Sequence, residues 1–156
     1  MLKEKNGFSL IELLLVLVLI GIFVGMTVNF SYRNKDRWAL RDTAREITSV
    51  YYQAKQRAAR ENASVRIDVT ADHYAYYWDK AGTWEALRNE PLPKNITASS
   101  TANFLINPSG FILDPATLKI AGSQTITLQA PRGADFDTMT ITIYPYGGLR
   151  VEKVFK

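Results

Sequence analysis

The sequence contains no cysteine, which excludes disulfide bonds, thiolate metal sites and a cysteine nucleophile. It has one histidine, His73, and its first proline is Pro91. No P-loop, nucleophile-elbow or zinc-protease motif is present. The sequence therefore shows no recognisable catalytic constellation. We expect a chain that is not an enzyme and that uses no metal or cofactor.

What the sequence does contain is a long uncharged run near its N-terminus. The run extends over twenty residues, from Leu13 to Tyr32. As a helix it would span about 30 Å, the thickness of a bilayer hydrocarbon core. Glu12 stands directly before it. Inserting a carboxylate into the apolar core costs about 2.5 to 3.5 kcal/mol, so Glu12 requires a partner.

The residues around Glu12 form a recognisable pattern. Residues 7–12 read Gly-Phe-Ser-Leu-Ile-Glu, after a short basic leader and before the apolar run. In this the chain resembles the type IV pilins and the pseudopilins of type II secretion. The resemblance implies that a prepilin peptidase cleaves after Gly7 and methylates the new amino group of Phe8. It also implies that Glu12 faces the Phe8 amine of a neighbouring subunit, where two ions that are costly apart form a pair.

Two other interpretations of the N-terminus explain less. A secretory signal would have a small-residue cleavage site after the apolar run, and none follows Val28. A plain single-span anchor leaves the Gly7–Phe8 junction and Glu12 unexplained. Basic residues stand on both sides of the run, so charge alone does not fix the orientation. A cytoplasmic leader, an inner-membrane helix and a periplasmic head follow from the resemblance.

Two glycines inside the apolar run have a spacing that matters for helix packing. Gly21 and Gly25 are four residues apart, and small residues at this spacing let two membrane helices approach closely. Glycine is also common in membrane helices that do not pack in this way. The sequence leaves both interpretations open.

A second apolar pattern follows the run. Apolar residues recur at steps of three and four, which predicts an amphipathic stem helix whose apolar side packs on the head. The helix is expected to run from about Leu10 to Arg60 and to end near Asn62. The apolar stripe comprises Leu40, Ala44, Ile47, Val50, Tyr51, Ala54 and Ala58.

From Ser64 onward the apolar period changes to two, which is typical of strands. The predicted strands are 65–69, 73–78, a short one near Ile96, 104–106, 125–128, 139–144 and 149–154. The predicted turns are 71–72, 79–83, 107–110 and 145–148. The sequence therefore predicts an α+β, pilin-like fold, with one long N-terminal helix packed on an antiparallel β-sheet head. Four segments are expected: leader 1–7, transmembrane assembly helix 8–32, stem helix 33–62 and head 63–156.

The head resembles the GspH/FimT group of minor pseudopilins and minor pilins. The matching segments are 52–62, a strand at Val65, 104–110 and 147–151. In some DNA-binding members of this group the last segment reads Gly-Arg-x-Arg. Here Gly148 stands at the first arginine position and only Arg150 remains.

The formal net charge is +4, and the stem accounts for it, with eight basic and four acidic residues between Arg33 and Glu61. Such a stem could attract phosphate non-specifically. We expect weak, salt-sensitive binding of nucleic acid at most.

The remaining candidate residues are open to more than one interpretation. His73 is expected on a sheet surface rather than in a catalytic site. Asp114, Asp135 and Asp137 are either calcium ligands or solvated loop residues. A group of aromatic residues is either a partner surface or, by strand alternation, half buried. These are Tyr74, Tyr76, Tyr77, Trp78 and Trp84.

The leading hypothesis is a minor pseudopilin of the type II secretion pseudopilus, located near the tip. Its partners would be the prepilin peptidase, other pilin or pseudopilin subunits and the inner membrane. The alternative is a minor pilin of a type IV pilus that serves assembly, adhesion or DNA uptake. A membrane-tethered enzyme is a third hypothesis, for which the sequence shows no catalytic constellation.

Overall fold

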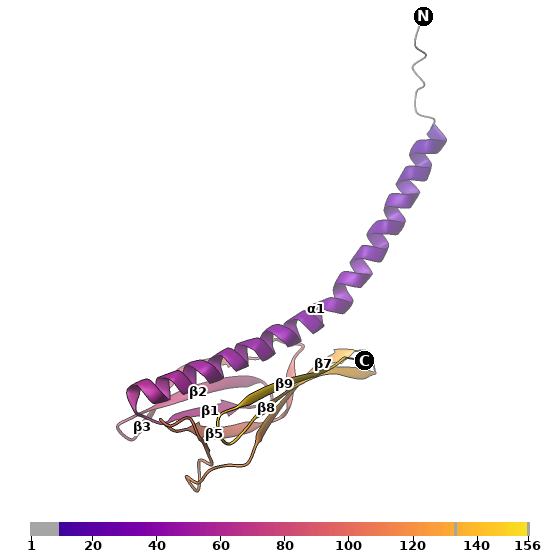
Figure 1. The fold of residues 1–156 in the computed structure, drawn as a ribbon. Coiled ribbons are helices and arrows are strands. Elements are labelled where there is room, and N and C mark those ends of the chain that lie inside the picture. Colours follow the sequence, from indigo (N-terminus) through magenta and orange to yellow (C-terminus); the bar gives the residue numbers. More distant parts are fainter. Residues whose placement is uncertain (1–9, 133, 156) are drawn as a thin grey trace, which may run out of the picture. The chain divides into compact units, whose positions relative to one another are not determined.

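The computed structural model describes the backbone of residues 10–132 and 134–155, and their side chains except those of residues 27–33. In this part of the chain one long helix is followed only by strands (Figure 1). The helix, α1, is Leu10–Glu61. The strands are β1 (Val65–Val69), β2 (His73–Lys80), β3 (Thr83–Pro91), β4 (Thr97–Ser100), β5 (Ala102–Ile106), β6 (Ile112–Leu113), β7 (Gln124–Arg132), β8 (Asp135–Ile143) and β9 (Leu149–Val154).

The end of α1 has a specific cause. Asn62 adopts a left-handed conformation with φ of 50°, and the backbone N–H of Ala63 donates to the carbonyl of Ala58 at 3.3 Å. This is the Schellman arrangement, which satisfies a helix carbonyl that would otherwise have no donor. The predicted helix end near Asn62 is confirmed.

The chain divides into two compact units, Met1–Lys35 and Asp36–Lys156. In the first unit, α1 carries apolar side chains that are exposed on every side from Leu10 to Met26. In the second unit, α1 lies against the strands, and its residues share one core with theirs.

The strands of the second unit form two antiparallel sheets. The first has the order β3-β2-β1-β5-β6 and the second the order β4-β7-β8-β9. The chain leaves the first sheet after β3, adds β4 to the second, and returns with β5. The α+β pilin-like fold is confirmed, with the strands divided between two sheets.

All of the predicted strands are present, and two observed strands were not predicted, β3 and the two-residue β6. The sequence analysis assigned no strand to residues 83–91, which form β3. This strand lies at the edge of its sheet and is mostly exposed, so it lacks the alternation that identifies a half-buried strand. Ile96 is buried directly before β4, so the short strand predicted near it begins one residue later.

The core is built from the predicted stripe of α1 and the inward residues of both sheets. Every stripe residue is buried, and Leu40, Ala54 and Ala58 have no exposed surface. The small alanines let the strands approach α1 closely, while Phe104, Ile126 and other large side chains fill the space between them. The prediction that the stripe packs on the head of the same chain is confirmed.

Candidate assembly site

The residues predicted to act in assembly fall at the start of the chain. Gly7 and Phe8 lie outside the described residues, so their roles remain predictions. Glu12 lies in the first turn of α1, where the positive end of the helix dipole favours a carboxylate. The neighbouring residues of α1 are apolar, and their side chains are exposed.

Gly21 and Gly25 lie in the same exposed part of α1. A Cβ atom built on either glycine would have no neighbour within 4 Å. Contacts within the described chain therefore do not require glycine at these positions. Their predicted role, close approach of a second helix, remains a prediction.

Among the described residues, no helix has an apolar stretch long enough to cross a membrane. The predicted transmembrane helix, residues 8–32, includes positions outside that description. These are residues 8 and 9 and the side chains of residues 27–32.

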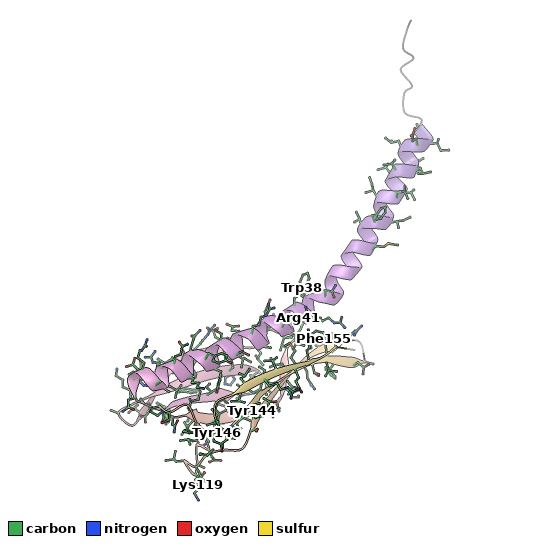
Figure 2. All side chains as sticks on the ribbon, viewed as in Figure 1. Trp38, Arg41, Lys119, Tyr144, Tyr146 and Phe155 are labelled. Atoms are coloured by element: carbon green, nitrogen blue, oxygen red, sulfur yellow. The ribbon has the colours of Figure 1, made fainter. Side chains whose placement is uncertain are left out.

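An ion pair with a buried carboxylate connects the start of the stem to the head. The Nε of Arg37 donates to Asp137 at 2.7 Å, and a nitrogen of Arg132 lies 3.6 Å from the same carboxylate. The Asp137 side chain is only 5% exposed. The guanidinium groups of Arg37 and Arg41 also lie over the ring of Phe155, at 5.3 and 4.9 Å. Figure 2 labels Arg41 and Phe155. This cluster joins α1, the β7–β8 hairpin and the C-terminal end of β9.

The sequence analysis did not find this cluster, although a signal for it exists. Asp137 shares the inward alternation of Met139, Ile141 and Ile143 in β8, and all four are buried. A carboxylate at an inward position of a strand requires a cation, because an unpaired buried charge is costly. Asp137 could thus have been assigned to an ion pair rather than to a loop.

A second contact fixes the stem farther along. The Nζ of Lys55 donates to the carbonyl of Gly147 at 3.1 Å. Gly110 and Gly147 both have positive φ, 82° and 77°, and lie against this side chain. A Cβ at Gly147 would come within 2.5 Å of the carbonyl oxygen of Gly110. Only glycine therefore fits where the two turns meet beneath Lys55.

Several stem residues make further contacts to the first sheet. Arg57 lies over the ring of Trp78 at 4.8 Å, and Glu46 forms an ion pair with Arg88. The charged groups of four stem residues thus contact the head: Arg37, Arg41, Lys55 and Arg57. The sequence suggested that the excess positive charge of the stem could attract phosphate. Part of this charge instead contacts the head.

The aromatic residues divide as strand alternation predicts. Tyr74 is buried, and burial is the main cause that raises its pKa. Arg66 lies over Tyr77 at 4.5 Å and over Trp84 at 5.3 Å, so its cation is held between two rings. Trp84 is 37% exposed. These rings pack with cations of the same chain rather than forming one open surface.

The remaining polar candidates have structural contacts. The Nδ1 of His73 lies 2.7 Å from Oγ1 of Thr70 and 2.9 Å from the carboxylate of Asp72. Hydrogen bonds from His73 and then Thr70 lower the pKa of Asp72. Asp114 accepts the backbone N–H groups of Thr117 and Ala116, which lower its pKa.

No group of three or more His, Cys, Asp or Glu residues in the described part of the chain is arranged to hold a metal ion. In particular, the structure does not bring Asp114 together with Asp135 and Asp137. Asp114 occupies the loop before β7, whereas the other two lie at the start of β8.

Known proteins resemble this chain in its N-terminal sequence and in its fold. Residues 2–28 match the family model of the prokaryotic N-terminal methylation motif. No curated protein sequence matches the chain.

Two solved structures are similar to this fold. The minor pseudopilin EpsH from the type 2 secretion system of Vibrio cholerae has a TM-score of 0.55 and 12% identity, and the match covers 73% of this chain and 96% of that one. The type IV minor pilin FimU of Pseudomonas aeruginosa has a TM-score of 0.54 and 16% identity, with 79% and 92% covered.

The architecture is that of a pilin-like protein, in which a long N-terminal helix packs on an antiparallel head. The family model matches the N-terminal motif alone, and the two solved structures show that the chain shares the fold of minor pilin and pseudopilin subunits.

Proposed function

We propose that this chain is a minor pseudopilin, a structural subunit near the tip of a type II secretion pseudopilus. The observation that carries the proposal is the methylation motif at residues 2–28, joined to a head with the fold of a minor subunit. In this role the prepilin peptidase cleaves after Gly7 and methylates Phe8. Residues 8–32 anchor the chain in the inner membrane, and the head lies in the periplasm. The chain then assembles with other pilin or pseudopilin subunits and performs no catalysis.

The second candidate is a minor pilin of a type IV pilus, which the similarity to FimU supports. A DNA-uptake version of this role has less support. Arg150, the arginine that remains of the Gly-Arg-x-Arg pattern, forms an ion pair with Glu152 at 2.7 Å. The genes beside this one distinguish the two systems, since a secretin with a secretion ATPase indicates secretion and a retraction ATPase indicates a pilus.

The experiment that tests the proposal addresses Glu12. Its carboxylate begins an otherwise apolar helix, and a neighbouring Phe8 amine is the cation that would neutralise it in a medium that screens charge weakly. Glu12→Ala should leave cleavage after Gly7 intact but reduce copurification with the other minor subunits about tenfold or more. Glu12→Gln should fall between, because it keeps a hydrogen-bonding group without the charge.

The matched control is Glu61→Ala, which removes a carboxylate at the other end of α1 and should change nothing. The readouts are mass spectrometry of the N-terminus and quantification of the copurified subunits. An uncleaved Met1 terminus in a strain with active peptidase would reject the proposal. Wild-type incorporation of Glu12→Ala would reject the charge-pair role.

A further inference from the structure

One sheet edge differs from the others in the described part of the chain. β6 has two residues, β4 has four with a register shift, and β3 has a register shift and ends at Pro91. β9 pairs with β8 over six consecutive residues without a shift, and its other side has no strand beside it. Regular edge strands can accept a further strand, whereas shifts and prolines prevent this.

The hairpin geometry shows which backbone groups of β9 point outward. The N–H of Tyr144 donates to the carbonyl of Gly148 at 2.8 Å and closes the hairpin. In an antiparallel pair, hydrogen-bonded and non-hydrogen-bonded positions alternate from such a pair. Arg150, Glu152 and Val154 therefore bond to β8, and the backbone groups of Leu149, Val151 and Lys153 face away from it.

α1 runs beside this edge. Arg37 and Arg41 contact Phe155 just after β9, and Lys55 contacts Gly147 just before it. The helix from Arg37 to Lys55 is about 27 Å long, and the strand from Gly147 to Phe155 is also about 27 Å. The two therefore lie antiparallel along their whole shared length.

The flank between α1 and β9 has exposed apolar groups and cations that are not neutralised by a carboxylate. Among the described residues, no carboxylate forms an ion pair with Arg41 or with Lys153, although Arg41 stacks on Phe155. Tyr52 on α1 is 47% exposed and Val151 on β9 is 41% exposed. The flank thus offers backbone hydrogen bonds, apolar surface and positive charge together.

We propose that β9 accepts an extended acidic segment of another protein as an added strand beside α1. The backbone of the segment would pair with Leu149, Val151 and Lys153. Because side chains alternate along a strand, every second residue of the segment would face α1. Carboxylates at these positions would meet Arg41 and Lys153, and apolar atoms would cover Val151 and Tyr52. Backbone pairing supplies affinity and the cations select for acidic segments.

The test uses the full-length chain in detergent and a labelled, blocked peptide of alternating valine and glutamate, about the length of β9. A peptide of alternating valine and lysine is the matched control. Fluorescence anisotropy should show binding of the acidic peptide only, and the affinity should fall as salt is added. Lys153→Glu should weaken that binding about tenfold and favour the lysine peptide.

Two proline variants test the backbone pairing. Val151→Pro removes an N–H that faces outward, so it should abolish peptide binding while circular dichroism of the head remains unchanged. Glu152→Pro removes an N–H that bonds to β8, so it should destabilise the head instead. If Val151→Pro fails to fold, hydrogen exchange of the unmodified chain tests the backbone pairing instead. The peptide should slow exchange of the Leu149, Val151 and Lys153 amides.

Four results would overturn the proposal. These are equal binding of both peptides, no binding of either, unchanged binding by a folded Val151→Pro variant, and no change in amide exchange when the peptide is added. Protection of the outward amides in the free chain, with a dimer in sedimentation, would instead show that a second copy covers β9.

Discussion

At the scale of single residues, Tyr51 is the clearest example of a core side chain with a group that lowers the stability of the fold. Its side chain is 1% exposed, and its hydroxyl has no hydrogen-bond partner among the described residues. Burial, and secondarily the nearby Tyr52, raise the pKa of Tyr51 to about 12. A buried hydroxyl without a partner costs about 1–3 kcal/mol. The ring therefore stabilises the core while the hydroxyl opposes it.

Tyr51→Phe should accordingly leave the free energy of unfolding unchanged or raise it by about 1 kcal/mol. By contrast, Leu40→Ala, in the same stripe, should lower it by about 2–5 kcal/mol. Urea unfolding near neutral pH measures both. A loss of more than about 1 kcal/mol in Tyr51→Phe would show that the hydroxyl has a stabilising partner.

The same residue predicts a response to alkaline pH. Because the pKa of Tyr51 is raised from 10.0 to about 12 on folding, the folded chain holds this proton more tightly than the unfolded chain. The stabilisation that comes from holding this proton in the folded chain is fully present below pH 10 and is lost as the pH rises toward 12. The difference in unfolding free energy between Tyr51→Phe and the unmodified chain should therefore grow across this interval. A constant difference would contradict the raised pKa.

At the scale of elements, turns determine how α1 and the two sheets meet. The N–H of Ile112 at the start of β6 donates to the carbonyl of Pro145, which lies in the turn between β8 and β9, so this bond joins the two sheets. Lys55 of α1 bonds to Gly147 of the same turn. The turn therefore connects three parts of the head through backbone groups.

Gly147→Ala should disrupt this connection. The left-handed φ of 77° disfavours alanine, and the new methyl group would collide with backbone, which cannot move aside as a flexible side chain can. We expect a loss of more than about 1 kcal/mol in urea unfolding. Gly122→Ala is the control, because a Cβ there has open space and the backbone is not left-handed. Equal stability of the two variants would contradict the described packing.

Elements with a strong apolar period, and the packing of the α1 stripe on the head, were predictable from the sequence, whereas the polar contacts between elements were not. The α1 stripe and strands such as β1 follow from spacing alone, because burial on one face imposes a period. β3 was missed because both of its faces are largely exposed. The Asp137 cluster was missed because its partners are 100 residues apart in sequence. Glu12 was singled out because a carboxylate is conspicuous in an apolar segment, and its role in assembly remains a prediction.

At the scale of the whole molecule, Asp36–Lys156 is a compact unit with its own core. The stem portion of α1 supplies Leu40, Ile47 and Tyr51 to that core. Without these side chains the inward faces of both sheets would be exposed to water. The stem is therefore part of the folding unit of the head.

A fragment that begins at Asn34 should be soluble and should unfold cooperatively in urea. Reductant should have no effect on it, because the sequence has no cysteine. A fragment that begins at Ser64 is the control and should not fold, because it lacks the stripe. Circular dichroism and urea titration measure both. Independent folding of the shorter fragment would show that the sheets do not need α1.

The two places where α1 is fixed to the head also determine how the molecule would respond to mechanical force. Arg37 meets Asp137 near one end of the stem and Lys55 meets Gly147 about 27 Å farther along. A pull along the helix axis loads both contacts and the apolar stripe between them at once, in shear. Separation would require all of them to fail together, whereas a pull across the axis would open them one after another. We therefore expect the head to resist tension along the axis of α1 better than it resists peeling away from α1.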